Sequence, residues 1–340
     1  MTRKKLLIVN LIATMIMGAI LPGCQKDNPD SVHFADYDNK LTVYTAHKEE
    51  IYKPIIREFE ERSGIRVEIV SGGTNEMLGK ISEDNGNGAA DIMFGGGVDS
   101  LVAYEKYFEP YVTTQADNLD RTYASATDSY TVFSKLPTVF IYNTKLVIPA
   151  GAPRTWSQLL EYRWKDQIAF ANPGKSGSAY TAFSMFLQRT MNDGYDRDEA
   201  IISFCKNLNN ELSDGSNTIV NDVARGDKMI GVVLEENALK GIEASADVEM
   251  IYPSDGTCAV PDGCAIVKGC RNRDNAEKFM EFIVCDDVQH LLEDQLYRRS
   301  VRTDFDSFAV PMEVPYDIDF SNENRDEILK LFNEHMEVIK

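Results

Sequence analysis

Four short segments rich in glycine, serine and threonine are the residues of this sequence best suited to bind a ligand. Each stands where a strand is predicted to end or a helix to begin, at residues 71–74, 95–97, 174–178 and 214–217. Helix N-termini present unpaired N–H groups and a positive dipole end, and glycine lets an anion approach the backbone. Alone, each segment is typical of a turn and helix cap. If the segments converge in a cleft, they form an anion site made of neutral donors.

Enzyme and metal motifs do not fit the sequence. Residues 174–176 resemble the end of a phosphate-binding P-loop, but Ala169 stands where that motif requires glycine. Residues 203–206 fit S-x-x-K, yet they lie in a predicted amphipathic helix and lack the accompanying motifs. The four histidines and six cysteines show no zinc-binding spacing. We therefore expect no catalytic residue, no metal site and no cofactor.

An adjacent pair of acids, Glu235 and Glu236, follows a predicted strand at 229–234. A carboxylate at this place could bind a sugar hydroxyl or an amine of a ligand. Acidic residues are equally typical of the first turn of a helix. Both interpretations stay open.

Alternating strand and helix patterns predict an α/β fold. A β-rich stretch at 41–45 is followed by a helix at 50–63, with Ile51, Ile55 and Phe59 at helical spacing, and by a strand at 65–69. This βαβ unit implies parallel strands. Further strands are expected at 91–94, 167–171 and 229–234, and further helices at 98–107, 178–191, 197–209 and the C-terminal stretch that ends near Ile339.

Pro137 interrupts a β-branched and aromatic segment at 131–143, which we interpret as a crossing between two domains. Residues 250–253 and 265–268 are expected to return to the first domain. The predicted organisation is a first part of lobe 1 at 41–135, lobe 2 at 136–252, and a return to lobe 1 at 253–340 with closing C-terminal helices.

The N-terminus has the pattern of an export leader. Basic residues at 3–5 precede an apolar run at 6–20 and the sequence Leu21-Pro22-Gly23-Cys24. These last four residues resemble a lipobox, which implies removal of residues 1–23, acylation of Cys24 and a polar tether at 24–40. A plain signal peptide with a stray cysteine is the alternative.

Composition limits the classes of partner. The 340 residues are 43% hydrophobic and 26% charged, which is typical of a globular chain long enough for about two domains. The formal net charge is −19, and loss of the three basic leader residues would make it more negative. A nucleic-acid-binding face needs a basic patch, so we expect no nucleic-acid partner.

Several segments together resemble the extracytoplasmic solute-binding proteins of ABC importers. The resemblance covers about residues 41–305, and its motifs lie at 43–50, 59–65, 90–96, 153–160, 168–178, 261–269 and 275–282. The nearest group is named for ferric iron and also contains binders of phosphonates, phosphoglycerate and hexose phosphates. The resemblance implies a two-lobed periplasmic-binding-protein type II fold, with a mostly parallel sheet in each lobe and the ligand in the cleft. It also implies a lipid-anchored, monomeric, non-enzymatic protein outside the cytoplasmic membrane, with a permease and an ATPase as partners.

Carried over by position, the resemblance implies a set of ligand-binding residues. They are His47, Gly73, Thr74, Gly96, Ser176, Ser178, Ser216 and Glu235. Thr74, Ser176 and Ser178 are expected to donate to a phosphate group, and His47 and Glu235 to face the organic part of the ligand.

The place after residues 230–233 decides the subgroup. Ferric-binding members have two adjacent tyrosines there, whereas this chain has Leu234-Glu235-Glu236-Asn237. We therefore predict a small phosphorylated or phosphonate-bearing anion, such as a sugar phosphate, as the ligand. Three alternatives remain: a metal binder that uses His47, Glu235 and an external anion; a sensory subunit of a membrane histidine kinase; and a secreted enzyme that acts on phosphoesters.

Overall fold

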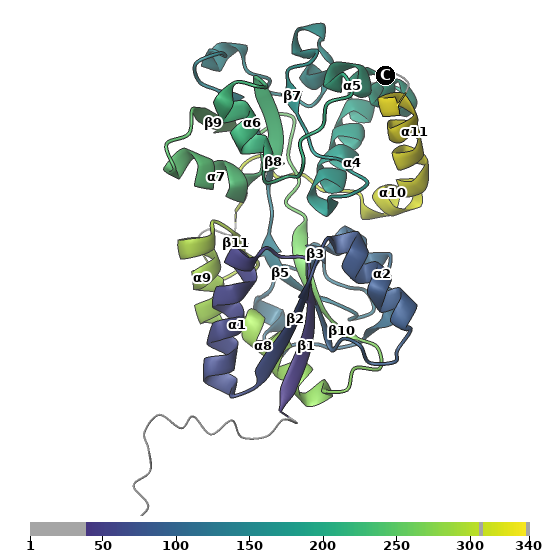
Figure 1. The fold of residues 1–340 in the computed structure, drawn as a ribbon, viewed down its shortest axis with the longest axis vertical. Coiled ribbons are helices and arrows are strands. Elements are labelled where there is room, and N and C mark those ends of the chain that lie inside the picture. The colour runs from purple at the N-terminus through teal and green to yellow at the C-terminus, as the bar shows by residue number, and fades with distance from the viewer. Residues whose placement is uncertain (1–38, 306–308, 338–340) are drawn as a thin grey trace, which may run out of the picture. The chain divides into compact units, whose positions relative to one another are not determined.

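The computed structural model describes residues 39–305 and 309–337, which form two α/β lobes (Figure 1). The predicted leader, Cys24 and nearly all of the tether lie outside these residues. Within them, no helix is long and apolar enough to cross a bilayer. The two-lobed α/β fold predicted from the sequence is confirmed.

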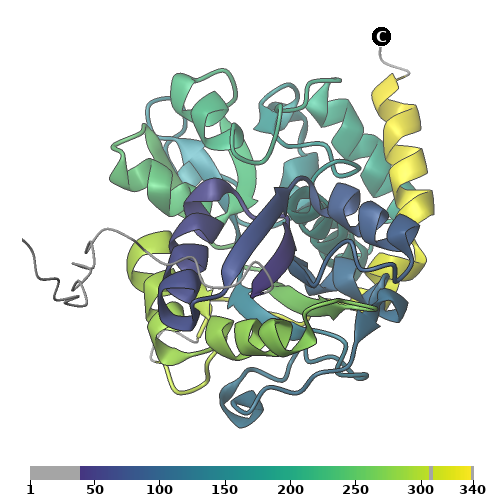
Figure 2. The same ribbon diagram turned by 60° about the horizontal axis from the view of Figure 1, so that its bottom comes forward.

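Lobe 1 is built on a seven-stranded sheet. Its strand order is β11-β5-β10-β3-β1-β2, with β4 paired to β10. The strands are β1 (Lys40–Thr45), β2 (Arg66–Ser71), β3 (Ile92–Gly97), β4 (Phe108–Glu109), β5 (Thr131–Lys135), β10 (Pro261–Val267) and β11 (Arg299–Ser300). The helices are α1 (Glu49–Ser63), α2 (Thr74–Asp84), α3 (Val98–Val102), α8 (Arg273–Ile283) and α9 (Asp286–Leu296). Figure 2 shows α1 and α8 on one side of β1 and β2, and α2 on the other.

The first βαβ unit forms as its sequence pattern predicts. In α1, Ile51, Ile55 and Phe59 recur at helical spacing, and all three are buried. Gly64 ends the helix in a left-handed conformation, φ 68°, and its N–H donates to the Glu60 carbonyl. Strands β1 and β2 then pair in parallel, so their carboxyl ends reach the same edge of the sheet.

Lobe 2 has a four-stranded sheet in the order β7-β8-β6-β9. Its strands are β6 (Thr138–Asn143), β7 (Ile168–Ala169), β8 (Ile230–Leu234) and β9 (Val248–Ile251). Its helices are α4 (Gly177–Asn192), α5 (Arg197–Leu208), α6 (Ile219–Arg225) and α7 (Glu235–Glu243).

Both sheets are mixed: most strands of each run in one direction, as expected, and a few run against them. Strand β10 is antiparallel to β3 and β5, and β6 is antiparallel to β8 and β9. The reason is the path between the lobes. Because β10 enters lobe 1 from the cleft, it must run opposite to β3, which ends there.

Three segments connect the lobes. The first, at 136–137, joins β5 to β6, and the second, at 252–260, joins β9 to β10. The third follows β11 and leads to α10 (Ile318–Glu323). Residues 250–251 lie in β9, which pairs with β6 in lobe 2, so their predicted return to the first lobe is wrong.

The C-terminal helices also differ from expectation. Helix α11 (Arg325–Glu337) packs along α5 and beside α4 of lobe 2 (Figure 1). Helix α10 contacts α3 of lobe 1 and also α4, where Tyr180 donates to the Ser321 carbonyl. Phe332 of α11 is fully buried and lies 5.1 Å from the ring of Phe183 in α4. An amphipathic pattern predicts which face of a helix is buried, but it does not say which surface receives that face.

Candidate functional site

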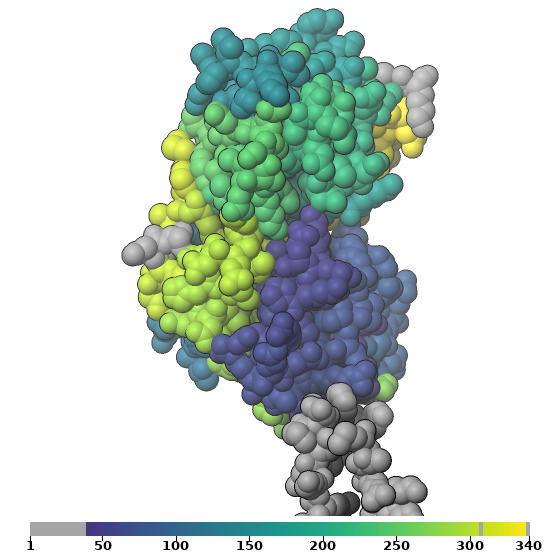
Figure 3. Space-filling model, turned by 60° about the vertical axis from the view of Figure 1, so that its left-hand side comes forward, coloured from purple at the N-terminus to yellow at the C-terminus, as the bar shows by residue number. Residues whose placement is uncertain are grey.

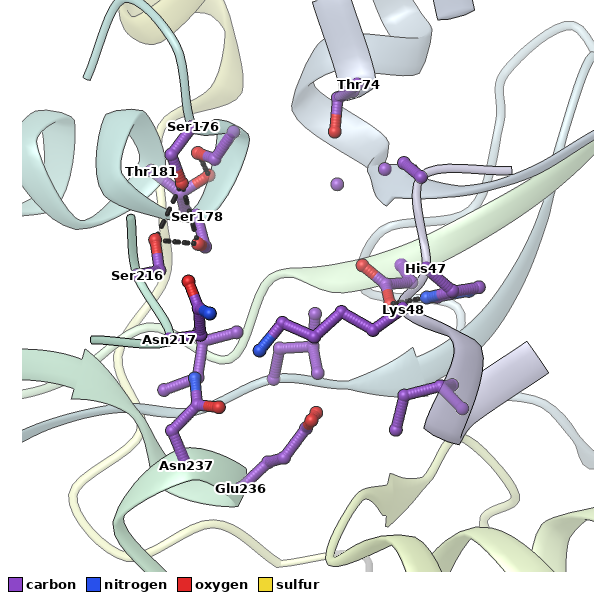
Figure 4. Close-up of a pocket in the computed structure, with 18 of the residues that line it drawn as sticks. His47, Lys48, Thr74, Ser176, Ser178, Thr181, Ser216, Asn217, Glu236 and Asn237 are labelled. Carbon is purple, nitrogen blue, oxygen red and sulfur yellow. Dashed lines mark hydrogen bonds and ion pairs between the residues drawn. The ribbon is translucent and has the colours of Figure 1, made fainter. Parts of the chain in front are cut away.

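A cavity of about 280 Å³ lies in the cleft between the two lobes (Figure 4). Residues from all four of the glycine-, serine- and threonine-rich segments line it. The strands β1, β3 and β8 end at this cavity, and the helices α1, α2, α4 and α7 begin there. Ligands of open α/β sheets bind at the carboxyl ends of the strands, which is where this cavity lies.

One wall of the cavity in lobe 2 carries three serine hydroxyls, which we call the hydroxyl cluster: Ser176, Ser178 and Ser216. The Oγ atoms of Ser176 and Ser216 are 2.7 Å apart, and that of Ser178 is 3.1 Å from each. Ser176 is also the N-cap of α4, since its Oγ accepts from the Ala179 N–H at 3.3 Å. Each hydroxyl can donate or accept, so the cluster can turn its donors toward an anion.

Thr74 faces the same space from lobe 1, at the first residue of α2 (Figure 4). Its hydroxyl has no hydrogen-bond partner among the residues that the structure describes. Gly73, which precedes it, lines the cavity as the N-cap of α2. Gly96 allows this arrangement: its φ is 92°, and a Cβ there would lie 2.8 Å from Thr74 Cγ2. The N-termini of α2 and α4 therefore face each other across the cavity, and the hydroxyls of Thr74 and of the hydroxyl cluster can donate hydrogen bonds to a ligand between them.

A charged cluster of His47, Glu236, Asp262 and Arg298 forms the floor. Arg298 Nε lies 2.6 Å from Glu236 Oε2, and Arg298 Nη1 donates to Asp262. The other Glu236 oxygen pairs with Lys240 Nζ at 3.1 Å. All four members of the cluster are buried, and both of its carboxylates are already paired with cations.

Burial and ion pairing determine the pKa shifts of the residues in the charged cluster. Burial first, and then the charge of Arg298, holds the pKa of His47 well below its ordinary value. Burial raises the pKa of Asp262, although Arg298 opposes this. For Glu236 desolvation acts upward, but Arg298 and Lys240 outweigh it and lower the pKa. The histidine is thus neutral at neutral pH, and it lies with Nδ1 3.5 Å from Asp262 Oδ2.

Glu235 does not face the cavity, which corrects the sequence prediction. Its carboxylate pairs with Arg299 Nε at 2.8 Å and accepts from the hydroxyl of Tyr252. The next residue, Glu236, lines the cavity instead. Consecutive residues of a helix differ in direction by about 100°, and the sequence did not show which of the two acids points inward.

The other seven predicted residues line the cavity: His47, Gly73, Thr74, Gly96, Ser176, Ser178 and Ser216. Several polar residues outside the predicted set line it as well: Lys48, Thr181, Asn217, Glu236, Asn237, Asp262 and Arg298. Asn217 lies in the predicted segment 214–217, Glu236 belongs to the predicted acidic pair, and Lys48 directly follows His47, so the sequence indicated the neighbourhood of these three residues. Arg298 lies far along the chain in no recognisable motif, and only the fold brings it to the site.

Comparisons with known proteins agree with this architecture. A family model for bacterial extracellular solute-binding proteins matches residues 89–331. The chain is 24% identical over 261 residues to a Salmonella typhimurium protein named a putative 2-aminoethylphosphonate-binding periplasmic protein, and the match covers 72% of each chain.

Two solved structures have the same fold. The first is the periplasmic binding protein AfuA from Actinobacillus pleuropneumoniae, with exogenous fructose-6-phosphate bound. It superposes with a TM-score of 0.77 at 22% identity, and the match covers 88% of this chain and 98% of AfuA. The ferric binding protein from Campylobacter jejuni superposes with a TM-score of 0.77 at 21% identity, and the match covers 87% of this chain and 99% of that protein. At such identities the likeness establishes the fold, and the family model adds the class of protein. The chain therefore belongs to the bacterial extracellular solute-binding proteins, as the solute-binding protein of an ABC importer with the type II periplasmic-binding-protein fold.

Proposed function

We propose that this protein binds a small phosphorylated or phosphonate-bearing organic anion and delivers it to its importer. The observation that carries the proposal is the hydroxyl cluster, which faces Thr74 across the cavity between the N-termini of α2 and α4. Hydroxyl and backbone N–H donors at helix N-termini are the groups that bind phosphate oxygens. Two similar proteins are named or described with ligands of this chemistry, a phosphonate and a sugar phosphate.

The ferric alternative has less support from the lining. No tyrosine is among the described residues that line the cavity, and Fe(III) favours hard anionic oxygen ligands. The carboxylates of Glu236 and Asp262 are held by Arg298, and Glu235 is held by Arg299. A ferric ion would have to break these ion pairs to obtain protein ligands.

Anchoring belongs to the proposal as well. We propose that Cys24 carries the lipid anchor, which would place the protein at the outer face of the cytoplasmic membrane or in the periplasm. The mass of the mature N-terminal peptide tests this, since an unacylated Cys24 would refute it.

The ligand class is tested by thermal shift on the protein from residue 25 onward. The panel contains hexose phosphates, glycerol phosphates, phosphoglycerates, aminoethylphosphonate, inorganic phosphate and ferric citrate, each alone. A ligand at about a hundred times its dissociation constant stabilises the fold by roughly 2.7 kcal/mol. We expect a shift with a phosphorylated or phosphonate compound. A shift with ferric citrate alone would refute the proposal.

The variant Ser176→Asp tests the site. Aspartate is also a good N-cap, so α4 should keep its start, while the new carboxylate stands where the ligand's anionic group is expected. Like charges in contact cost several kcal/mol, so the affinity should fall at least about 100-fold with little change in melting temperature. Thr144→Asp adds the same charge at the exposed far end of β6 and should bind as the wild type does. Unchanged affinity in Ser176→Asp would remove the hydroxyl cluster from the site.

A further inference from the structure

Lys48 enters the cavity from lobe 1, immediately before α1. Figure 4 shows its side chain extending across the cavity, with the ammonium toward the amides of Asn217 and Asn237. Among the residues that the structure describes, none forms a hydrogen bond or an ion pair with this ammonium. The cleft desolvates it, and this desolvation is the main reason that the pKa of Lys48 is lowered. A cation in such a place is stabilised by an anionic partner.

The acids beside it do not serve as that partner. Glu236 pairs with Arg298 at 2.6 Å and with Lys240 at 3.1 Å. Asp262 pairs with Arg298 through Nη1, and Glu50 pairs with Lys240 at 3.2 Å. Each carboxylate of the charged cluster is thus already in an ion pair within the protein, so among the described lining residues this end of the cavity offers no unpaired acid for an ammonium group of a ligand. It does offer the free ammonium of Lys48.

The two ends of the cavity therefore both suit anions, in different ways. The hydroxyl cluster supplies neutral donors, and Lys48 supplies a positive charge flanked by two amides. Because the cavity measures only about 280 Å³, one small molecule would span both ends.

We propose that Lys48 is a specificity residue that binds a second anionic group, so that the ligand carries a phosphate or phosphonate at one end and a carboxylate or second phosphate at the other. This inference rests on the proposed function, since it takes the first anionic group to lie at the hydroxyl cluster. It disfavours ligands with an ammonium at the second end.

Isothermal titration of matched compounds tests the inference. 3-Phosphoglycerate, glycerol 3-phosphate and phosphoethanolamine have similar sizes, and beside the phosphate they carry a carboxylate, hydroxyls and an ammonium. Fructose 1,6-bisphosphate against fructose 6-phosphate tests a second phosphate. A charge-assisted hydrogen bond is strong enough that we expect the compound with the second anion to bind about 10- to 100-fold more tightly than its partner.

The variant Lys48→Met removes the charge and keeps most of the side-chain volume. It should bring the affinity ratio within each pair close to one, whereas Lys48→Arg should retain the preference. Lys53→Met is the matched control, because Lys53 lies exposed on α1 outside the cavity, where it pairs with Glu49. It removes the same charge and should leave the ratio unchanged.

The outcomes separate the two proposals. If phosphorylated compounds bind but a second anion gives no preference, or if Lys48→Met weakens both members of a pair equally, the role of Lys48 is refuted and phosphate binding stands. If phosphoethanolamine binds most tightly, the role of Lys48 is refuted as well. If no phosphorylated compound binds, the proposed function fails and this inference fails with it.

Discussion

His47 shows how one buried side chain can contribute both to the site and to stability. The centroid of its ring lies 4.5 Å from that of Phe94 and 5.6 Å from that of Phe133, and the side chain is buried. Asp262 and Arg298 are the charged groups that face it. Because burial holds the pKa of His47 well below its ordinary value, this histidine stays neutral in the folded protein. In the unfolded chain it becomes protonated below about pH 6.5.

The protonation of His47 predicts a pH dependence. As the pH falls below about 6.5, the unfolded state binds a proton that the folded state does not, so the free energy of unfolding decreases by up to about 1.4 kcal/mol per pH unit. His47→Gln removes this contribution and should make the protein less sensitive to acid between pH 7 and pH 5.5. Urea unfolding at both pH values measures it. The exposed His290→Gln is the control, and an unchanged pH dependence in His47→Gln would contradict the prediction.

The direction of single side chains marks the limit of the sequence prediction at this scale. The place of the acidic pair at the cleft was predictable, because it follows a strand that ends there. Which of Glu235 and Glu236 points inward depends on Arg298 and Arg299, which pair with one acid each and arrive from a distant part of the chain. The local sequence around Glu235 and Glu236 does not indicate with which arginine each acid pairs.

At the scale of elements, α11 completes the apolar core of lobe 2. It packs along α5, and Phe332 lies among the aromatic rings that α4 and α5 contribute. Arg197 at the start of α5 also donates to Asn324, just before α11, at 2.9 Å. The last described helix is therefore part of lobe 2 and not an accessory to lobe 1.

Phe332→Ala should test this packing. Truncation of a fully buried phenylalanine costs about 3–5 kcal/mol, because it loses apolar contacts and leaves a cavity. Its exposed neighbour supplies the control, since Asn333→Ala should change the stability by less than about 0.5 kcal/mol. Urea unfolding measures both variants. A loss for Phe332→Ala no larger than for Asn333→Ala would show that α11 does not pack on lobe 2 in solution.

Elements with strong periodicity were predictable, and elements set by distant contacts were not. The helix expected at 178–191 is α4 (Gly177–Asn192), and the strand expected at 229–234 is β8. The helix expected at 98–107 instead breaks after Val102, and a short 3₁₀ turn follows at Glu105–Tyr107. The antiparallel direction of β10 depends on the crossing path, which strand periodicity does not encode.

At the scale of the whole described molecule, the lobes contact each other on two sides of the cavity. On one side α7 reaches lobe 1 through three ion pairs, Glu236 with Arg298, Glu235 with Arg299, and Lys240 with Glu50. Figure 3 shows the green atoms of α7 meeting the purple and yellow-green atoms of lobe 1 at this face. On the other side Thr74 of lobe 1 approaches Gly177 of lobe 2. The structure thus describes the cleft in a closed form.

The close approach of Thr74 to Gly177 predicts that a larger side chain at position 177 prevents the lobes from closing. An ideal Cβ on Gly177 would lie 3.2 Å from Thr74 Oγ1, so the larger side chain in Gly177→Val should hold the lobes apart. We expect an increased radius of gyration by small-angle scattering in the presence of ligand, together with weaker binding. Gly151→Val, on the surface of lobe 2 away from the cleft, should change neither. A wild-type radius and affinity in Gly177→Val would contradict the closed contact.

The three connections between the lobes also determine when each lobe can be completed during synthesis. Strand β10, between β3 and β5 in lobe 1, comes from residues 261–267, and the final helix of lobe 2 comes from residues 325–337. A nascent chain that ends before residue 261 therefore lacks the strand between β3 and β5 of lobe 1 and the last described helix of lobe 2. Pairings this distant in sequence form slowly. For a chain that has to leave the cytoplasm, this delay favours export before folding, and the binding cleft is assembled only after both lobes have received their last elements.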